Sequence, residues 1–177
     1  MTLNYQSTPP WRAVPQVIRN VCASPAGAGR KGEAAISGRG ETKRLIAPIA
    51  GIYAWHDALN SGNTDRLVEL VHEEVEVGGP RAAGRGVVLL REWVERAEIR
   101  LEPRRVFHQD GAVVVEQRAA WRSADTGRYG DPHGIASSFW IRDGRVQRVT
   151  CYADLDEALA AAGLDTSHEV RGAATGP

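Results

Sequence analysis

The order of the first elements follows from residues 55–80, which have the sequence WHDALNSGNTDRLVELVHEEVEVGGP. Gly62 stands where a helix commonly ends, because glycine adopts the left-handed conformation of a C-cap without strain. Asn63 or Thr64 can then cap a second, short helix. The apolar face of that helix consists of Leu67, Leu70 and Val71. A strand is predicted from Val75 onward, and it leads into the Gly-Gly-Pro sequence that ends the stretch.

The helix that ends at Gly62 begins upstream of this stretch. Pro48 suits its first turn, where the missing N–H costs nothing. Apolar positions recur there at helical spacing, and they are Ile49, Ile52, Tyr53, His56 and Leu59. Downstream, residues 81–86 are predicted to form a loop. A third helix follows, with one side made of Val87, Leu90, Val94 and Ala97.

From residue 99 onward the apolar pattern changes to alternation with a period of two. Strands are expected at residues 99–108, 112–122, 135–142 and 145–152, with hairpin turns at Asp110-Gly111 and Asp143-Gly144. Asp154 and Glu157 form a capping-box pattern before a closing helix over residues 155–162. This order predicts an α+β fold in which three N-terminal helices pack against a curved antiparallel sheet. A short C-terminal helix completes a cone with an apolar cavity.

One folded domain is expected, residues 44–164, between two less ordered ends. Residues 1–43 contain many glycines and prolines and lack apolar periodicity, so we expect a disordered or weakly ordered leader. Residues 165–177 are expected to form a loose tail. The domain between them has about 120 residues, which is enough for a single core.

The composition favours a globular protein of a reducing compartment. The chain has 22 basic and 22 acidic residues, so its net charge of zero provides no field that would hold nucleic acid or an anionic membrane. No apolar run is long enough to span a bilayer, and the first residues do not resemble a signal peptide. Cys22 and Cys151 lie far apart, which favours reduced thiols over a disulfide scaffold. We therefore expect a cytoplasmic protein.

Two segments of the chain resemble a known superfamily. ALNSGNTDRLVELVHEEVEV is similar to the opening of the nuclear-transport-factor-2-like (NTF2-like) superfamily, in its SnoaL-like branch, except that Asn63 stands where aspartate is usual. FWIRDGRVQRVTCYADLDEAL is similar to the terminal hairpin of that family. The resemblance covers residues 49–164 and implies a cone-shaped α+β barrel that is often a homodimer through the open sheet face. Its members include several enzyme classes and many binding proteins, so the fold alone does not supply a function.

The residues that ketosteroid isomerases of this fold use are not present in their usual form. Such enzymes need a carboxylate base and two donors that hold an enolate oxygen. The resemblance places the base at Gly79 and the phenol donor at Trp55, whose indole N–H is a much weaker acid. The second donor, a protonated carboxylic acid, falls near Ala136 or Ser137.

The catalytic set of the epoxide hydrolases is absent as well. The resemblance places its arginine and first aspartate at Gln117 and Ala119, and its second aspartate at Cys151. Polyketide cyclases of this fold rely on an aspartate that has no clear counterpart here. The carboxylates near the expected sites are Glu74, Glu76 and Glu116.

Alternation along the strands predicts the lining of a ligand pocket. If Gln117 points inward, Val113, Val115, Ala119 and Trp121 do so too, and Val149 lies on the same side as Cys151. The predicted pocket residues are Trp55, Gln117, Ala119, Trp121, Val149 and Cys151. In the alternative interpretation the tryptophans, including Trp93 and Trp140, only fill the tapering core.

Two histidines, each with an aspartate close by in sequence, supply the candidate acid/base groups. His133 lies on a loop where Asp131 can orient its ring. His56 lies on the apolar face of the first helix, where it is either a satisfied core histidine or a base in the pocket, and Asp57 adjoins it. Of the other histidines, His72 is expected at the end of the second helix and His108 is expected to be exposed.

Three functions therefore stay open. The first is binding of a small hydrophobic ligand in an apolar cone pocket. The second is a cofactor-independent isomerase, polyketide cyclase or dehydratase with a non-standard acid/base. The third is a dimerisation or interaction module whose cavity is filled. No motif for a metal or phosphate-bearing cofactor is present in the sequence, so we expect neither. The expected partners are a small apolar molecule and a second copy of the chain, with no nucleic acid and no membrane.

Overall fold

The computed structural model describes residues 42–79, 82–123 and 125–171. The predicted leader lies outside these ranges except for its last two residues, and so do Cys22 and the end of the predicted tail. None of the helices in the described part of the chain is both long and apolar enough to cross a membrane.

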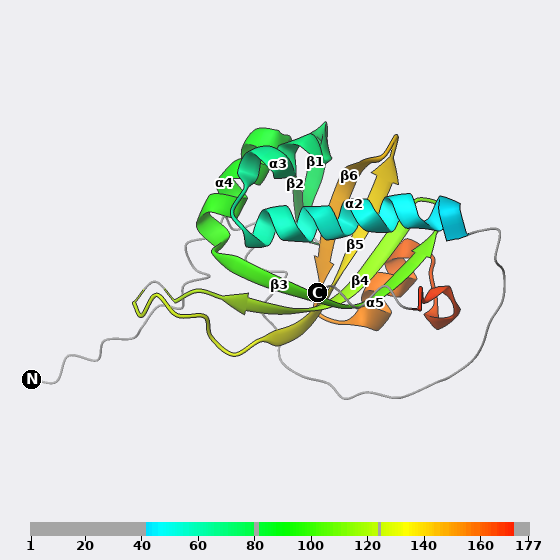
Figure 1. The fold of residues 1–177 in the computed structure, drawn as a ribbon. Coiled ribbons are helices and arrows are strands. Elements are labelled where there is room, and N and C mark those ends of the chain that lie inside the picture. Colours follow the sequence, from blue (N-terminus) through cyan, green and yellow to red (C-terminus); the bar gives the residue numbers. More distant parts are fainter. Residues whose placement is uncertain (1–41, 80–81, 124, 172–177) are drawn as a thin grey trace, which may run out of the picture.

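Helices and strands follow one another in two groups (Figure 1). The first group consists of α2 (Thr42–Asn60), α3 (Thr64–Glu69), β1 (Val71–Gly79), β2 (Ala82–Arg85) and α4 (Val87–Ala97). The second consists of β3 (Ile99–Gln109), β4 (Ala112–Trp121), β5 (His133–Arg142), β6 (Arg145–Tyr152), α5 (Leu155–Ala162) and the 3-10 helix η2 (Thr166–His168). The architecture is α+β, as predicted.

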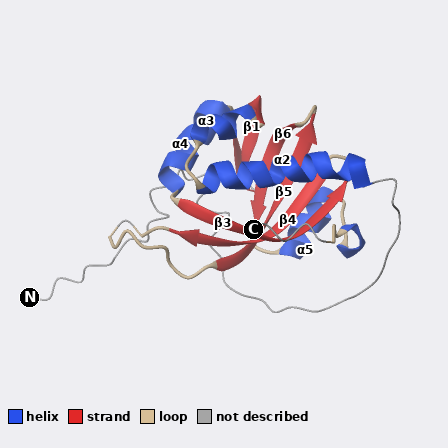
Figure 2. Cartoon of the chain, viewed as in Figure 1, coloured by secondary structure: helices blue, strands red, loops and turns tan. Residues whose placement is uncertain are grey.

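The six strands form one curved, unclosed sheet in the order β2-β1-β6-β5-β4-β3 (Figure 2). Neighbouring strands are antiparallel except β1 and β6, which run in parallel. Tight turns join β3 to β4 and β5 to β6, whereas most of the domain separates β1 from β6. No hairpin therefore imposes opposite directions on that pair, and the sheet is mixed.

Both predicted hairpin turns are confirmed. Asp110 and Gly111 have φ values of 49° and 86°, and Asp143 and Gly144 have values of 50° and 74°. A two-residue turn with positive φ at both central positions matches the twist of the strands that it joins. The Asp-Gly pairs therefore set the register of the two hairpins.

Three local predictions are wrong. Helix α2 begins at Thr42, so Pro48 lies inside it rather than in its first turn. Strand β1 begins at Val71 rather than Val75, so His72 lies on a strand and not at a helix end. Residues 82–85 form β2 instead of a loop, because they pair with the end of β1. In the last two cases pairing with neighbouring strands outweighs local propensity.

The core has an apolar layer on each face of the sheet. Helices α2, α3 and α4 cover the inner face, where Trp55, Leu67, Leu90 and Phe139 are fully buried. Helix α5 packs on the outer face against a smaller cluster of side chains from β3 to β6. Helix α2 lies across the sheet, so the residues of its last turns face the strands that carry the candidate site (Figure 1).

The free edge of β3 is covered at two places. The side-chain amide of Asn60 pairs with both backbone groups of Leu101, donating to the carbonyl and accepting from the N–H at 2.8 Å each. Farther along the strand, the N–H of Val170 donates to the carbonyl of Val106 at 2.8 Å. Residues 165–171, the start of the predicted tail, therefore lie against β3. Both contacts occupy backbone groups that an edge strand otherwise leaves open.

Candidate functional site

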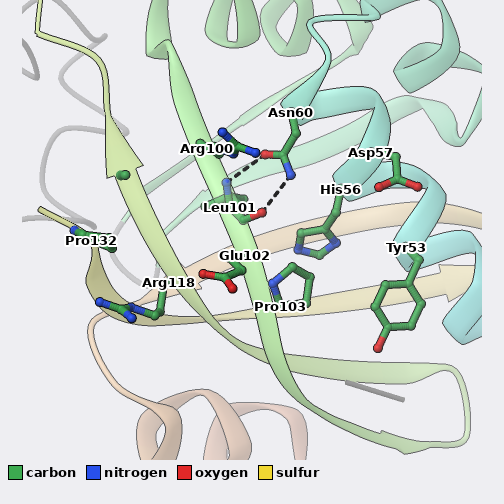
Figure 3. A pocket seen from close by; sticks show the side chains of 11 residues that line it. Tyr53, His56, Asp57, Asn60, Arg100, Leu101, Glu102, Pro103, Arg118 and Pro132 are labelled. Carbon is green, nitrogen blue, oxygen red and sulfur yellow. Dashed lines mark hydrogen bonds between the residues drawn. The ribbon is translucent and has the colours of Figure 1, made fainter. Parts of the chain in front are cut away.

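A pocket of about 520 Å³ lies between α2 and the first residues of β3. Its lining residues are Tyr53, His56, Asp57, Asn60, Arg100, Leu101, Glu102, Pro103, Arg118, Ala120 and Pro132. Figure 3 shows Tyr53 and Asp57 on one side of the β3 ribbon and Arg118 and Pro132 on the other. Small-molecule sites commonly have volumes of roughly 300–1,000 Å³, so this pocket has the size of a ligand site.

The contact between Asn60 and β3 joins the two elements that line the pocket. The two hydrogen bonds of Asn60 to Leu101 fix the C-terminal end of α2 against the strand (Figure 3). Gly62, with φ 67°, then turns the chain away from the helix. A shallower depression of about 660 Å³ adjoins the pocket and shares Asn60, Asp57 and Arg100 with it. The polar end of α2 therefore lies between two hollows.

Two arginines in the pocket have no ionic partner in the part of the chain that the structure describes. In the ladder between β3 and β4, Arg100 lies opposite Ala120 and Arg118 lies opposite Glu102, so the arginines are diagonal neighbours. Within the described residues neither arginine forms an ion pair, whereas Glu102 is paired with Arg104 at 3.0 Å. Two guanidinium groups are thus available to an anionic ligand.

Tyr53 adds a hydroxyl on the α2 side of the pocket, across β3 from Arg118 in Figure 3. Its oxygen is buried and has no hydrogen-bond partner among the described residues. Burial raises the pKa of the Tyr53 phenol above its usual value, so the hydroxyl stays protonated and can donate a hydrogen bond. A buried donor without a partner costs about 1–3 kcal/mol, a cost that an acceptor on a ligand would relieve.

A chain of buried polar side chains crosses the inner face of the sheet behind the pocket. The ring of His56 approaches the carbonyl of Ile52 through Nδ1 and Oε1 of Gln117 through Nε2, at 2.7 Å each. Nε2 of Gln117 donates to Oγ of Ser137 at 2.8 Å. That oxygen lies 3.5 Å from the sulfur of Cys151. The polar chain therefore links α2 to β4, β5 and β6.

His56 fits the interpretation as a satisfied core histidine. Burial lowers its pKa, and its hydrogen bonds to Gln117 and Ile52 and the nearby charge of Asp57 oppose that shift only in part. Both ring nitrogens already face partners inside the protein. A molecule in the pocket would have to displace one of these partners to reach a ring nitrogen, so the geometry does not favour His56 as a general base.

The six residues of the predicted ligand pocket share the inner face, but they do not line the observed pocket. Trp55, Gln117, Ala119 and Val149 are each at most 2% exposed and lie in packed core, while Trp121 and Cys151 are partly buried. The rings of Trp55 and Phe139 meet edge to face, with centroids 5.2 Å apart. The indole N–H of Trp55 is buried and has no hydrogen-bond partner within the described ranges. The predicted alternation is thus correct, whereas the cavity lies elsewhere.

Asp131 does not orient the ring of His133 in this structure. Both residues are exposed, and within the described ranges no hydrogen bond or ion pair joins them. The ring of His133 instead lies 6.3 Å from that of Trp121, between centroids. Pro132, between the two candidates, lines the pocket, so their loop does reach its rim.

His108 is not the exposed residue that was expected. Both of its ring nitrogens are buried and lack a partner among the described residues, and burial lowers its pKa. Within the same ranges, no group of three histidine, cysteine or acidic side chains converges as a metal site would require.

The charged lining of the pocket was missed at the sequence level. Arg100, Glu102 and Arg118 look like ordinary exposed positions of an alternating strand. The turn at Asp110-Gly111 is the signal that brings β3 and β4 together, yet a bulge between Pro103 and Arg105 shifts the pairing by one residue. Without that bulge Arg118 would lie opposite Pro103, so the turn alone does not predict the cluster.

Comparison with solved structures shows the same fold in proteins of low sequence identity. An NTF2-like protein of unknown function from Cytophaga hutchinsonii has a TM-score of 0.52 and 14% identity, over 60% of this chain and 89% of that one. TerC, co-crystallised with polyporic acid, has a TM-score of 0.54 and 20% identity, over 61% and 92%. An epoxide hydrolase from M. tuberculosis has a TM-score of 0.53 and 18% identity, over 66% and 88%.

Other proteins of this fold are provisionally named as a polyketide cyclase, from Sinorhizobium meliloti, and a ketosteroid isomerase, from Kribbella flavida. No curated protein matches the chain. A family model described as the SnoaL-like domain matches residues 52–149, more than half of the chain. The chain therefore belongs to the SnoaL-like domain family, and its fold is similar to that of NTF2-like proteins.

Proposed function

We propose that this protein binds a small molecule that carries an acidic group, in the pocket between α2 and β3. The observation that carries the proposal is a pair of arginines, without ionic partners among residues 42–79, 82–123 and 125–171, in a pocket of about 520 Å³. The two guanidinium groups lie on adjacent strands as diagonal neighbours. Together they can donate several N–H hydrogen bonds to the oxygens of one carboxylate or enolate.

The remaining lining suits an apolar body on such a ligand. Leu101, Pro103, Ala120 and Pro132 supply apolar surface, and the ring of Tyr53 adds an aromatic wall. A ligand with a flat or apolar skeleton would cover this surface while its acidic group meets the arginines. The family supports the proposal: TerC, which has a similar fold, was co-crystallised with polyporic acid.

The test compares a naphthalene carboxylate with its neutral carboxamide, which has nearly the same shape. We expect saturable binding of the carboxylate by fluorescence titration and binding of the amide that is weaker by about fivefold, since one partly exposed ion pair contributes about 1 kcal/mol. The substitution Arg118→Gln should remove this preference. Arg145→Gln is the matched control, because Arg145 is exposed and does not line the pocket.

Two outcomes would overturn the proposal. One is equal affinity for the carboxylate and the amide, or no saturable binding of either. The other is an equal loss of carboxylate affinity in Arg118→Gln and Arg145→Gln, which would assign the effect to net charge rather than to the pocket.

A second candidate function, an interaction module, is favoured by the packed interior. Trp55, Phe139 and Gln117 are buried between α2 and the sheet, and none of them lines the pocket. On the outer face Trp140 is 40% exposed and lies opposite Arg148. A homodimer through this part of the sheet would cover the indole. Light scattering of the wild type and of Trp140→Lys tests this, and a monomer in both would exclude the dimer.

The isomerase, cyclase and dehydratase alternatives have less support. They require an acid/base within reach of a bound molecule, and the two nitrogens of His56 are occupied inside the core. Asp57 is exposed on the pocket wall and is the remaining candidate on α2. Activity that survives Asp57→Asn would exclude it.

A further inference from the structure

The donors and acceptors along the polar chain from His56 to Cys151 determine how many hydrogens the His56 ring carries. As the atoms lie, Nδ1 of His56 faces the carbonyl of Ile52 and Nε2 faces Oε1 of Gln117. Both partners are acceptors, so both ring nitrogens must carry hydrogens. This is the arrangement of a protonated imidazole ring.

Burial favours the other protonation state. The His56 ring is 1% exposed, and desolvation is the largest influence on its pKa, which it lowers. In a neutral ring Nδ1 keeps its hydrogen for the carbonyl of Ile52, and Nε2 becomes an acceptor. The amide of Gln117 must then present its N–H group, which a half-turn about its last side-chain bond achieves without moving any heavy atom far.

That half-turn of the Gln117 amide changes the direction of the other hydrogen bonds in the polar chain. With the amide N–H directed to His56, the oxygen of Gln117 faces the hydroxyl of Ser137, which must now donate to it. The oxygen of Ser137 is then open to a hydrogen from the thiol of Cys151, 3.5 Å away, where either atom can be the donor. In the protonated state every one of these bonds points the opposite way.

We propose that His56, Gln117, Ser137 and Cys151 form a proton-coupled relay, in which one proton taken up by His56 reverses all three hydrogen bonds between them. In the neutral state Cys151 donates to Ser137, and in the protonated state Cys151 accepts from it. The proton comes from solvent through the pocket wall, where the His56 ring lies, and no covalent bond forms or breaks. The relay thereby connects the pocket to β6, across the sheet.

The charged groups around His56 influence whether its ring is neutral or protonated. Asp57 is its neighbour on α2, and its negative charge favours the protonated ring. The other titratable or charged groups on the same pocket wall are Tyr53 of α2, Arg100 and Glu102 of β3, and Arg118 of β4. The elements β5 and β6 meet the relay through Ser137 and Cys151. An anion bound by Arg100 and Arg118 would bring negative charge near the ring and would favour the reversed state.

The test is a pH titration of the His56 ring by ¹⁵N NMR in the full chain. We expect a neutral ring with its hydrogen on Nδ1 at about pH 7. Ser137→Ala removes the partner of Gln117 in both states, and the protonated state loses more because its hydrogen bonds are charge-assisted, so the pKa of His56 should fall by roughly half a unit. A structural role alone would not change the pKa of a histidine that Ser137 does not touch.

Matched variants separate the relay from general loss of packing. Ser138→Ala is the control on the same strand, because Ser138 is also buried but forms no bond to the relay among the described residues. Cys151→Ser keeps a donor and acceptor at the end of the relay and should leave the pKa of His56 unchanged. Cys151→Val removes both and should lower it.

Three results would overturn the relay. The first is a neutral His56 ring with its hydrogen on Nε2. The second is a His56 pKa that is the same in the wild type, in Ser137→Ala and in Cys151→Val. The third is a shift in Ser138→Ala equal to that in Ser137→Ala. The relay is tested without any ligand. Its result therefore does not depend on whether the proposed pocket binds an acidic molecule.

Discussion

At the scale of the residue, the burial of His56 opposes protonation of its ring. The ring is buried, and burial lowers its pKa below the value of about 6.5 that it has in an unfolded chain. The unfolded state therefore binds a proton more readily than the folded state as the pH falls below that value. The free energy of unfolding must decrease from about pH 6.5 downward, until the folded ring is protonated too.

This conflict predicts a specific pH dependence of stability. His56→Gln lacks the titrating ring, so its free energy of unfolding should fall less between about pH 7.5 and pH 5.5 than that of the wild type. His108→Gln is the comparison, because burial lowers the pKa of His108 as well but leaves this residue partly exposed. Urea unfolding at the two pH values measures both. An identical pH slope for wild type and His56→Gln contradicts the prediction.

Two glycines allow a clean test of turn strain. Gly111 and Gly144 both have positive φ, but a Cβ on Gly111 would lie 3.0 Å from the carbonyl oxygen of Ile141, whereas a Cβ on Gly144 meets nothing within 4 Å. We expect Gly144→Ala to cost about 1 kcal/mol from backbone strain alone, and Gly111→Ala to cost more. Equal losses in chemical denaturation would show that the close approach to Ile141 has no energetic effect.

At the scale of the element, Asn60 joins α2 to the edge of β3. Asn60→Ala removes two hydrogen bonds to Leu101 and leaves both backbone groups of that residue without protein partners. We expect a loss of about 1–2 kcal/mol and faster hydrogen exchange at the Leu101 amide. Ser61→Ala is the control, because the hydroxyl of Ser61 bonds only to carbonyls of its own helix. Unchanged exchange at Leu101 would contradict the proposed role of Asn60.

The segment 165–171 is a second element, and a side-chain contact helps to hold it against β3. Glu169 meets Arg105 through two hydrogen bonds of 3.0 and 2.8 Å, which lower the pKa of Glu169. Because the pair is partly exposed, Glu169→Gln should cost at most about 1 kcal/mol, and less at high salt. The more exposed pair of Glu69 and Arg66 gives the reference, and Glu69→Gln should cost less. A larger loss in Glu69→Gln would contradict this order.

At the scale of the whole molecule, the sequence predicted the architecture better than the site. Alternation along β4 was enough to put Gln117 and Ala119 on one face of the sheet, which in the structure is the inner face. The parallel pairing of β1 with β6 and the bulge near Pro103 depend on contacts between distant segments. Local patterns do not report such contacts, so the pocket with Arg100 and Arg118 was not predicted.

The packing of the inner face explains why the six predicted pocket residues do not line the observed pocket. Trp55 and Phe139 fill the space that a smaller pair of side chains would leave open. Alternation identifies which residues face inward, but it does not say whether their volumes leave a cavity. The observed pocket lies instead between the polar end of α2 and the edge of β3.

The central claim is that an acidic small molecule binds between α2 and β3. The most direct measurement is an NMR titration of the ¹⁵N-labelled protein with the naphthalene carboxylate. The account predicts saturable chemical-shift changes that cluster at Tyr53, Asn60, Arg100 and Arg118, around the observed pocket. Saturable changes confined to the outer face around Trp140, or no saturable change at these four residues, would contradict it.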